Sequence, residues 1–431
     1  MAKSLTKKTN RSCVIGLDGV PHGMIVDLAQ RGIMSTMARL MDSGHLHRMK
    51  ASLPEISAVS WTNFMTGTNP GTHGIFGFTD FKPRSYEVRF PNFLDVKTPT
   101  IWDKLGAKGK RCIVINQPST YPAREIKGVL VSGFVAIELA KAVRPLSNLA
   151  VLERMGYQID IDIMKCRENP AVLWQELSKT MSGRQKALNH YWEEDWDYFE
   201  FVITGTDRLH HFLWKAYEDP SHPSHQNFLD FYRHIDRLIG KIISSYQKLT
   251  GSDEGLYILS DHGFTGITQE VYLNAWLAKA GYLKFAKSDP EGLQDIAPRT
   301  RAFALDPNRI YLNFKNKFPK GTVERSAKRA LKEEIARKLE KLEHQGRKVV
   351  RKVFFADEIY SGPHKANGPD LIVLGHPGFD MKGSIRKKEV FGRSSLQGMH
   401  TWDDAFFWAS KDHGPDLAID DLAPIILGNF S

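Results

Sequence analysis

The stretch LYILSDHGF, residues 256–264, decides the fold. Its four leading residues are all apolar and do not alternate with polar ones, which is typical of a strand buried on both faces. The run ends abruptly in Asp261 and His262. Because sites in open parallel sheets lie at the carboxyl ends of the strands, a carboxylate and an imidazole here indicate a functional site.

Similar apolar runs recur along the chain: CVIGLDG at 13, CIVINQP at 112, GVLVSGF at 128, FEFVITGTD at 199, RIYLNF at 309 and DLIVLG at 370. Stretches with helical periodicity lie between them, namely TMARLMDSG, AVLWQELSKTMSGRQKALNHYW, NFLDFYRHIDRLIGKIISSYQKL and YLNAWLAKAGYL. The alternation predicts an α/β protein, a three-layer αβα sandwich with a mostly parallel central sheet.

The length of 431 residues predicts one large domain with insertions or two subdomains, because single cores stop growing below this size. We expect a catalytic core in two parts, residues 11–136 and 196–431. Residues 137–195 lie between two core strands and are rich in helix, which predicts a small helical cap or insertion. Lys and Arg are dense in 323–352, where apolar residues at helical spacing predict a basic helical segment with a solvated face.

The composition describes a soluble globular protein whose charge suits an anionic substrate. Lys and Arg number 59 against 49 Asp and Glu, a net charge of +10. No aromatic-rich RNA-binding signature or paired-Cys zinc finger accompanies this charge, so no nucleic-acid partner is required. The three cysteines, Cys13, Cys112 and Cys166, are odd in number and widely spaced, which argues against a disulfide framework.

The beginning of the chain is basic and passes directly into a strand pattern, without the long apolar segment of a signal peptide. No run approaches the roughly 18 apolar residues that span a bilayer. A cytoplasmic location without a membrane span is therefore expected.

Three of the strand-like runs end in an aspartate: Asp18, Asp207 and Asp261. The carboxyl ends of parallel strands meet at one edge of a sheet, so these carboxylates are expected to converge. Taken singly, each could be the N-cap of the next helix. Convergence without a counter-charge would be unfavourable, because buried carboxylates repel one another and lose hydration.

Histidines near two of these aspartates indicate a metal site. His262 follows Asp261 directly, and the sequence RLHH after Asp207 places His211 at i+4 on the same helix face. His210, at i+3, is an equally possible partner by spacing alone. Imidazole and carboxylate together suit zinc or manganese better than calcium.

The segment PEISAVSWTNFMTGTNPGTHGIFGF, residues 54–78, supplies a candidate nucleophile. It reads as a helix start followed by a turn rich in Gly and Pro. Ser57 would lie at the helix N-terminus, where free N–H groups and the positive end of the dipole favour an alkoxide and a nearby phosphate. Ser57, rather than Ser60 one turn later, is therefore the expected nucleophile.

With these motifs in hand, the chain resembles the alkaline phosphatase superfamily. The resemblance is to the branch of type I phosphodiesterases, nucleotide pyrophosphatases and predicted phosphohydrolases or phosphomutases. The motifs occur in the family's order: GLDG around Asp18, SAVSWTNFMTGTNPGTHGIF, TDRLHHFLW, SDHGF and GMHTWDD around His400. The resemblance implies an alkaline-phosphatase-like fold. It also implies a metal-dependent phosphohydrolase that cleaves phosphate mono- or diesters through a phosphoserine on Ser57.

The resemblance also implies the ligands of two divalent metal ions, zinc or alternatively manganese, and a small-molecule phosphoester as substrate. The first site maps to Asp207, His211 and His400. The second maps to Asp18, Asp261 and His262, with Ser57 as a further ligand. The resemblance alone selects His211 over His210 and brings in His400, since a lone histidine is more often a loop or core residue.

One departure from the family pattern concerns phosphate binding. Nucleotide pyrophosphatases carry an Asn shortly after the HGI motif, and this chain has Phe78 there. Asn63, Asn116 or a backbone donor is the expected replacement. Many family members use Thr as nucleophile, and Ser is chemically equivalent.

Two other functions are compatible with the same residues. A phosphomutase or phosphotransferase would return the phosphoryl group from the phosphoserine to a substrate instead of to water. A non-catalytic, metal-bearing binding module would keep the ligands without turnover. No G-x-S-x-G elbow, H-E-x-x-H motif, P-loop or G-x-G-x-x-G turn points to another enzyme class.

Overall fold

The computed structural model describes residues 10–431, so the first residues of the basic N-terminal stretch lie outside it. Its contacts divide the chain into two compact units. The first combines the chain up to residue 68 with 92–264 and 400–431, and the second combines 69–91 with 265–399. Residues 137–195 belong to the first unit. Their role as a cap, and the division into 11–136, 137–195 and 196–431, stay predictions.

The first unit is built on a nine-stranded sheet with the order β22-β2-β21-β9-β1-β8-β5-β6-β7. In that order the strands are Leu417–Ala418, His45–Lys50, Ala405–Ala409, Leu256–Leu259, Ser12–Leu17, Tyr198–Ile203, Cys112–Gln117, Gly128–Ser132 and Val143–Arg144. The five central strands, from β9 to β6, run parallel to one another. This confirms the predicted mostly parallel sheet.

Strand β1 occupies the middle of the sheet. It pairs with β8 in the register Leu17↔Ile203 and with β9 in the register Gly16↔Leu259. The three strands therefore stop at the same edge. The three aspartates predicted to converge follow these strands.

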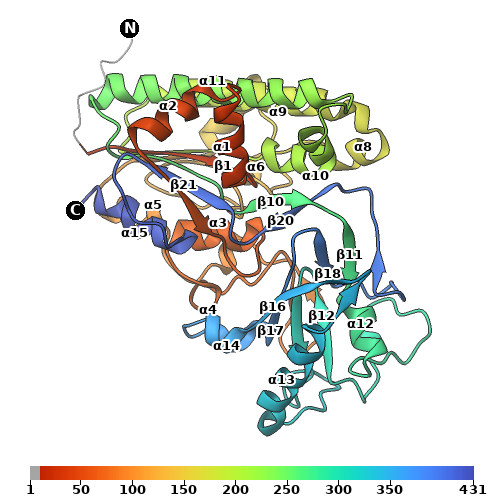
Figure 1. Ribbon diagram of the computed structural model, residues 1–431. Helices are drawn as coiled ribbons and strands as arrows, with labels where there is room; N and C mark the ends of the chain where they lie inside the picture. Colours follow the sequence, from red (N-terminus) through yellow and green to blue (C-terminus); the bar gives the residue numbers. More distant parts are fainter. Residues whose placement is uncertain (1–9) are drawn as a thin grey trace. The chain divides into compact units, whose positions relative to one another are not determined.

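Helices cover both faces of the sheet (Figure 1). One layer contains α1 (His22–Gln30), α2 (Ser35–Ser43), α9 (Leu173–Trp192), α10 (Gly205–Glu218) and α11 (His225–Thr250). The other layer contains α3 (Ser57–Thr66), α5 (Ile101–Ala107) and α15 (Leu422–Gly428). The predicted three-layer αβα sandwich is thus present.

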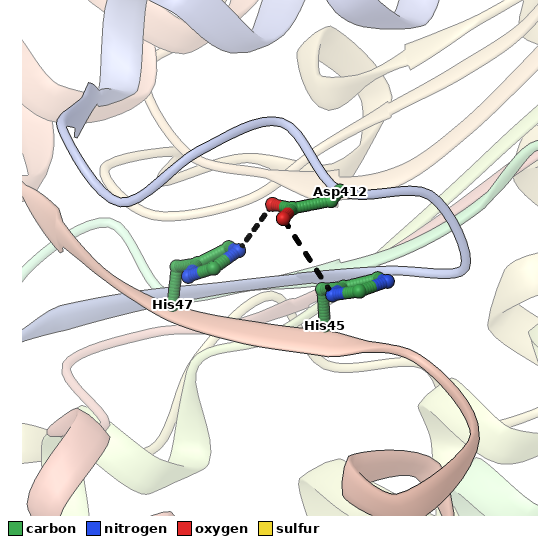
Figure 2. A group of neighbouring side chains, drawn as sticks. All are labelled: His45, His47 and Asp412. Carbon is green, nitrogen blue, oxygen red and sulfur yellow. Dashed lines mark hydrogen bonds and ion pairs between the residues drawn. The ribbon is translucent and has the colours of Figure 1, made fainter.

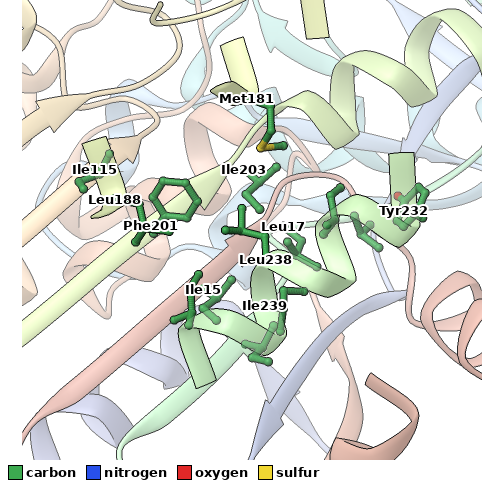
Figure 3. Close-up of a cluster of buried hydrophobic side chains, with 14 of the residues drawn as sticks. Ile15, Leu17, Ile115, Met181, Leu188, Phe201, Ile203, Tyr232, Leu238 and Ile239 are labelled. Carbon is green, nitrogen blue, oxygen red and sulfur yellow. The ribbon is translucent and has the colours of Figure 1, made fainter. Parts of the chain in front are cut away.

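The main core lies between the sheet and the first helical layer. Figure 3 shows Leu17 of β1 and Ile203 of β8 facing Met181 of α9 and Leu238 of α11, and all four side chains are buried. The apolar periodicity of α9 and α11 predicted their buried faces. On the opposite face of the sheet, Trp61 of α3 lies against Gly16 of β1, where a Cβ atom would come within 2.6 Å of the indole ring.

The second unit contains a four-stranded sheet in the order β12-β13-β17-β16, whose neighbouring strands are all antiparallel. Its strands are Ala302–Leu305, Arg309–Leu312, Leu371–Gly375 and Val350–Phe355. Helix α12 (Leu273–Lys279) also belongs to this unit. The runs at 309 and 370 therefore form strands outside the central sheet. Their apolar character reflects burial, and burial alone does not distinguish one sheet from another.

The prediction of a helical segment over 323–352 is only partly correct. Helix α13 covers Lys328–Leu339, after which a short hairpin joins β14 (Glu343–His344) to β15 (Arg347–Lys348). Gln345 and Gly346 at the turn have φ values of 50° and 74°. Positive φ at both central positions is the geometry of a tight hairpin turn, which ends the helical pattern locally.

The three cysteines, Cys13, Cys112 and Cys166, are free and buried. Within residues 10–431, no helix is both long enough and apolar enough to cross a bilayer.

Candidate active site

The predicted residues gather at the carboxyl edge of the central strands. Asp18 follows β1, Asp261 and His262 follow β9, and Asp207 lies in the first turn of α10, just after β8. All four side chains are buried. The sheet topology therefore brings together residues that are up to 244 positions apart in the sequence, which is the difference between 262 and 18.

The first group consists of Asp207, His211 and His400. Oδ1 of Asp207 lies 3.4 Å from Nε2 of His211 and 3.3 Å from Nε2 of His400. The two Nε2 atoms are 3.1 Å apart. A tetrahedral ion with bonds of roughly 2.0–2.1 Å separates its ligand atoms by about 3.4 Å, so this triangle has the dimensions of one zinc coordination face.

The second group surrounds Nε2 of His262. This atom lies 3.3 Å from Oδ2 of Asp261 and 3.7 Å from Oδ1 of Asp18. The hydroxyl oxygen of Ser57 is 3.1 Å from the same nitrogen. The two groups adjoin, because donor atoms of Asp207, His262 and His400 also lie within 4.8 Å of one another.

Backbone carbonyls orient two of the imidazoles. Nδ1 of His262 lies 3.0 Å from the carbonyl oxygen of Gly263, and Nδ1 of His400 lies 2.8 Å from that of Glu55. A carbonyl only accepts, so each Nδ1 carries the proton and donates it. Each Nε2 then presents a lone pair, which is the usual arrangement around metal-ligating histidines.

The structure distinguishes His211 from His210. His210 is fully buried, with Nδ1 2.8 Å from the carbonyl oxygen of Gly19 and Nε2 2.7 Å from the hydroxyl of Tyr232. Both of its nitrogens are therefore engaged away from Asp207. His211, one residue later on α10, is the histidine whose Nε2 faces Asp207.

The electrostatics of the two groups fit divalent cations. Oδ1 of Asp207 and Oδ2 of Asp261 are buried without a hydrogen-bond partner. Burial, with a contribution from Asp207, raises the pKa of Asp261 to about 8. Burial also lowers the pKa of His400 to about 3, which keeps that imidazole neutral. Unpaired carboxylate oxygens beside imidazole lone pairs are an arrangement that a bound cation stabilises, so these residues could hold metal ions.

Asp18 has the same character. Burial and the neighbouring carboxylates of Asp261 and Asp207 raise its pKa well above the ordinary value. Its Oδ2 accepts a hydrogen bond of 3.0 Å from the indole nitrogen of Trp61, and its Oδ1 lies 3.4 Å from the donating hydroxyl of Ser57. Trp61 lies one turn after Ser57 on α3, so this helix positions both the hydroxyl and the carboxylate beside it.

Ser57 begins α3 and is only 4% exposed. Its hydroxyl faces Asp18 and His262 at the N-terminus of the helix. Ser60 instead contacts the Ser52 hydroxyl at 2.8 Å and accepts from the Ser52 backbone N–H at 3.3 Å. The two serines therefore have different surroundings, and only Ser57 faces the carboxylate and imidazole groups.

Arg208 is a site residue that the sequence analysis missed. Its guanidinium lies 2.6 Å from Oδ2 of Asp160, 3.2 Å from Oδ2 of Asp207, and over the ring of Phe134 at 4.1 Å. Burial acts to raise the pKa of Asp207, but His211, His400 and Arg208 together hold it well below the ordinary value. Arg208 directly follows Asp207 in the sequence, and this adjacency was the signal that could have identified it as a site residue.

Gly19 forms the turn beneath the site. Its φ is +66°, and a Cβ atom there would lie 3.1–3.2 Å from atoms of His262, Asp207 and Phe264. Its backbone N–H donates to Oδ1 of Asp261 at 3.0 Å. A side chain would therefore be strained and would press on the candidate ligands.

The predicted phosphate contacts differ in their surroundings. Asn116 is fully buried; its amide donates to the carbonyl of Val202 at 2.8 Å, and its oxygen accepts from Tyr157 at 3.4 Å. Substrate binding by this side chain would require these bonds to break, and a phosphate contact from Asn116 stays a prediction. Asn63 is buried on α3. Phe78 belongs to the second unit.

A sequence profile of the family described as type I phosphodiesterase / nucleotide pyrophosphatase matches residues 12–403. Among curated proteins, no sequence match is found.

Solved structures with a similar fold include phosphonoacetate hydrolase from Sinorhizobium meliloti 1021 in complex with phosphonoformate. Its TM-score is 0.64 at 16% identity, with 99% of this chain and 97% of that chain covered. The same enzyme in complex with phosphonoacetate matches at 15% identity and a TM-score of 0.64, with the same coverage. An inactive variant of murine ectonucleotide pyrophosphatase / phosphodiesterase 5 in complex with AMP has a TM-score of 0.56 at 12% identity, covering 97% and 94% of the two chains.

Proposed function

Because the chain belongs to the type I phosphodiesterase / nucleotide pyrophosphatase family, we propose that it is a divalent-metal-dependent hydrolase of phosphate mono- or diesters. The proposed reaction passes through a phosphoserine on Ser57. The observation that carries the proposal is the meeting of Asp18, Asp207 and Asp261 beside the Ser57 hydroxyl, at the shared edge of three parallel strands.

Two ions would be held by the two groups described above, zinc being the metal that the donor set favours and manganese the alternative. Asp207, His211 and His400 would hold the first, and Asp18, Asp261 and His262 the second, with Ser57 beside it. When bound, the ions would supply Lewis-acid stabilisation of the attacking and leaving oxygens.

The residues of the chain would prepare the nucleophile. The Ser57 hydroxyl lies 3.1 Å from Nε2 of His262 and 3.4 Å from Oδ1 of Asp18, so two groups able to accept its proton are within reach. Attack forms the bond between Oγ and phosphorus and breaks the bond between phosphorus and the leaving oxygen. The serine proton passes to a neighbouring acceptor at the site, and a proton from solvent water converts the leaving oxygen to the alcohol. The N-terminus of α3, with the positive end of its dipole, would face the phosphoryl oxygens at this stage.

Water would then cleave the phosphoserine, releasing phosphate or a monoester and regenerating the serine hydroxyl. Transfer of the phosphoryl group to a second substrate molecule at this step would instead make the protein a phosphomutase. The +10 net charge suits an anionic substrate in either case. The structural neighbours were solved with phosphonates and with AMP, so a small phosphonate and a nucleotide are included among the substrates tested below.

The test is a substrate screen on protein stripped of metal and reloaded separately with zinc, manganese, cobalt or magnesium. The panel contains bis-p-nitrophenyl phosphate, p-nitrophenyl phosphate, AMP and phosphonoacetate. Free phosphate and released alcohol are scored separately, and the Ser57→Ala variant is the matched control. We expect metal-dependent turnover of at least one ester, lost in the variant.

The opposite outcomes are distinct. Full activity after EDTA, in protein whose elemental analysis finds no transition metal, would exclude metal dependence. With a sugar phosphate added to the panel, its isomerisation without phosphate release would identify the phosphomutase. Metal binding without turnover on the whole panel would favour the binding module.

A further inference from the structure

A second cluster of metal-type donors lies outside the active site, on β2 and the loop after β21. His45 and His47 are two positions apart on β2 and so project from the same face of the strand. Asp412 approaches both imidazoles from the loop, as Figure 2 shows. Donor atoms of the three side chains all lie within 4.8 Å of one another. None of the three contributes to the proposed catalytic groups.

The sheet topology explains why the loop reaches this place. Strand β2 has β21 on one side, in the register His45↔Ala409 and His47↔Phe407, and β22 on the other. The connection over 410–416 must therefore cross β2 to pass from one neighbour to the next. Asp412 lies on this crossing segment, which places a carboxylate above the two imidazoles.

The carboxylate is held in position by its own loop. Oδ1 of Asp412 accepts a hydrogen bond of 2.8 Å from the backbone N–H of Gly414. The same oxygen lies 2.8 Å from Nε2 of His47, and Oδ2 lies 3.9 Å from Nδ1 of His45. Each carboxylate oxygen thus faces a different imidazole nitrogen, and the two rings are nearly parallel, with an interplanar angle of 14°.

Neighbouring lysine and arginine side chains are paired elsewhere. Arg48, the residue after His47, projects from the other face of β2 and pairs with Asp404 at 3.4 Å. Lys411, next to Asp412, pairs with Glu254. Among the described residues, the ion-pair partners of Asp412 are therefore the imidazoles of His45 and His47, and no lysine or arginine pairs with it.

We propose that His45, His47 and Asp412 form a third divalent-cation site, suited to zinc, which fastens the 410–416 crossing to β2. Two imidazoles and one carboxylate make a zinc ligand set, with a fourth position left for water. A cation would replace the direct contact between His47 and Asp412, because both nitrogens must offer lone pairs to it. Side chains that are 22–57% exposed would exchange the ion readily with solvent.

The site would act on stability rather than on chemistry. It joins a strand near the beginning of the chain to a loop near its end, and an ion that binds only the folded state stabilises that state. Zinc should therefore raise the melting temperature of the wild-type protein more than that of a protein lacking these ligands.

The experiment compares the full chain with the double variant His45→Gln/His47→Gln. A matched control, His190→Gln, replaces an exposed histidine on α9. Each protein is stripped with chelator and titrated with zinc by equilibrium dialysis and by thermal denaturation. We expect the double variant to bind one zinc ion fewer per chain and to gain less in melting temperature, while His190→Gln matches the wild type. Equal stoichiometry and equal thermal shifts in all three proteins would overturn the proposal.

A second variant distinguishes loss of the metal site from a defect in folding. Asp412→Asn keeps an oxygen for the Gly414 N–H and for His47 but removes the charge. Zinc binding at this site should weaken by at least about tenfold, with unchanged circular dichroism and unchanged metal-restored turnover. When both proteins are titrated with cobalt, the absorption spectrum of the wild type minus that of the variant should also show the visible bands of one low-symmetry ion. No cobalt difference spectrum and no loss of zinc affinity would each contradict the site, whatever the number of ions that the catalytic groups bind.

Discussion

The Nε2 atoms of His211 and His400 face each other at 3.1 Å, although the two residues are 189 positions apart in the chain. With Nδ1 of His400 donating to the carbonyl of Glu55, its Nε2 is a lone-pair donor directed at a second imidazole. Two such nitrogens at this distance require a proton or a cation between them. Oδ1 of Asp207, 3.3 Å from His400, completes a triangle that favours the cation.

The adjacent histidines of α10 should therefore respond oppositely to replacement. His211→Ala should bind about one metal ion less and lose turnover while keeping its melting temperature in the metal-free state. His210→Ala removes a buried ring bonded to Gly19 and Tyr232, so it should cost about 2–4 kcal/mol of unfolding free energy. Elemental analysis and urea denaturation of both proteins check this. A His210→Ala protein that loses metal but not stability would reverse the assignment.

Ser57→Ala should lower turnover by several orders of magnitude with nearly unchanged metal content, because Asp18, Asp261 and His262 still surround the second position. Ser60→Ala should retain most activity and lose about 1 kcal/mol of stability with its bonds to Ser52. Mass spectrometry of protein quenched during turnover should find added phosphate on the peptide containing Ser57. Wild-type rates in Ser57→Ala would contradict the mechanism.

Arg208→Met should weaken metal binding by about 10–100-fold, because the guanidinium fixes the second oxygen of Asp207. Arg124→Met is the matched control: Arg124 also lies over an aromatic ring, Phe93 at 3.8 Å, and pairs with Asp103, but has no contact with the site. Zinc competition with a chromophoric chelator measures both affinities. Equal affinities in the two variants would limit Arg208 to a structural role.

Glu200 should make stability fall as pH rises. Burial raises the pKa of this β8 carboxyl to about 8 from an ordinary value of 4.5. The folded state then holds a proton that the unfolded state has released, so unfolding free energy decreases between about pH 4.5 and 8. The loss should be on the order of a few kcal/mol.

Urea denaturation in chelator from pH 5 to 9 measures this slope, with Glu200→Gln as the control, since an amide does not titrate. The wild-type curve should be steeper than that of the variant over this range, and parallel curves would show that Glu200 titrates normally in the fold.

The sequence predicted the part of the site that depends on strand ends. Asp18, Asp207 and Asp261 could be placed together because parallel strands share a carboxyl edge, and the observed registers bear this out. His400 could not be placed from local pattern, because it reaches the site through β20 (Gly398–Thr401), far along the chain. Only the resemblance to a family named it in advance.

Two other features depended on tertiary contacts. Arg208 is held beside Asp207 by contacts with Asp160 and Phe134, which are distant in the sequence. Such contacts leave no periodic pattern from which they could be predicted. The runs at 309 and 370 had the apolar character of central strands, but they pair antiparallel with each other and with β12 and β16 in a second sheet. Apolar runs report that a strand is buried and do not report which strands it joins.

The two segments of the second unit, 69–91 and 265–399, are inserted in the sequence close to Ser57 and the candidate ligands. The longer segment begins at residue 265, three positions after His262, and ends at residue 399, directly before His400. The shorter segment begins at residue 69, three positions after the end of helix α3, which Ser57 begins. Every candidate ligand nevertheless belongs to the first unit. Exchange of the inserted segments between related proteins would therefore leave Ser57 and the candidate ligands in place on the edge of the nine-stranded sheet.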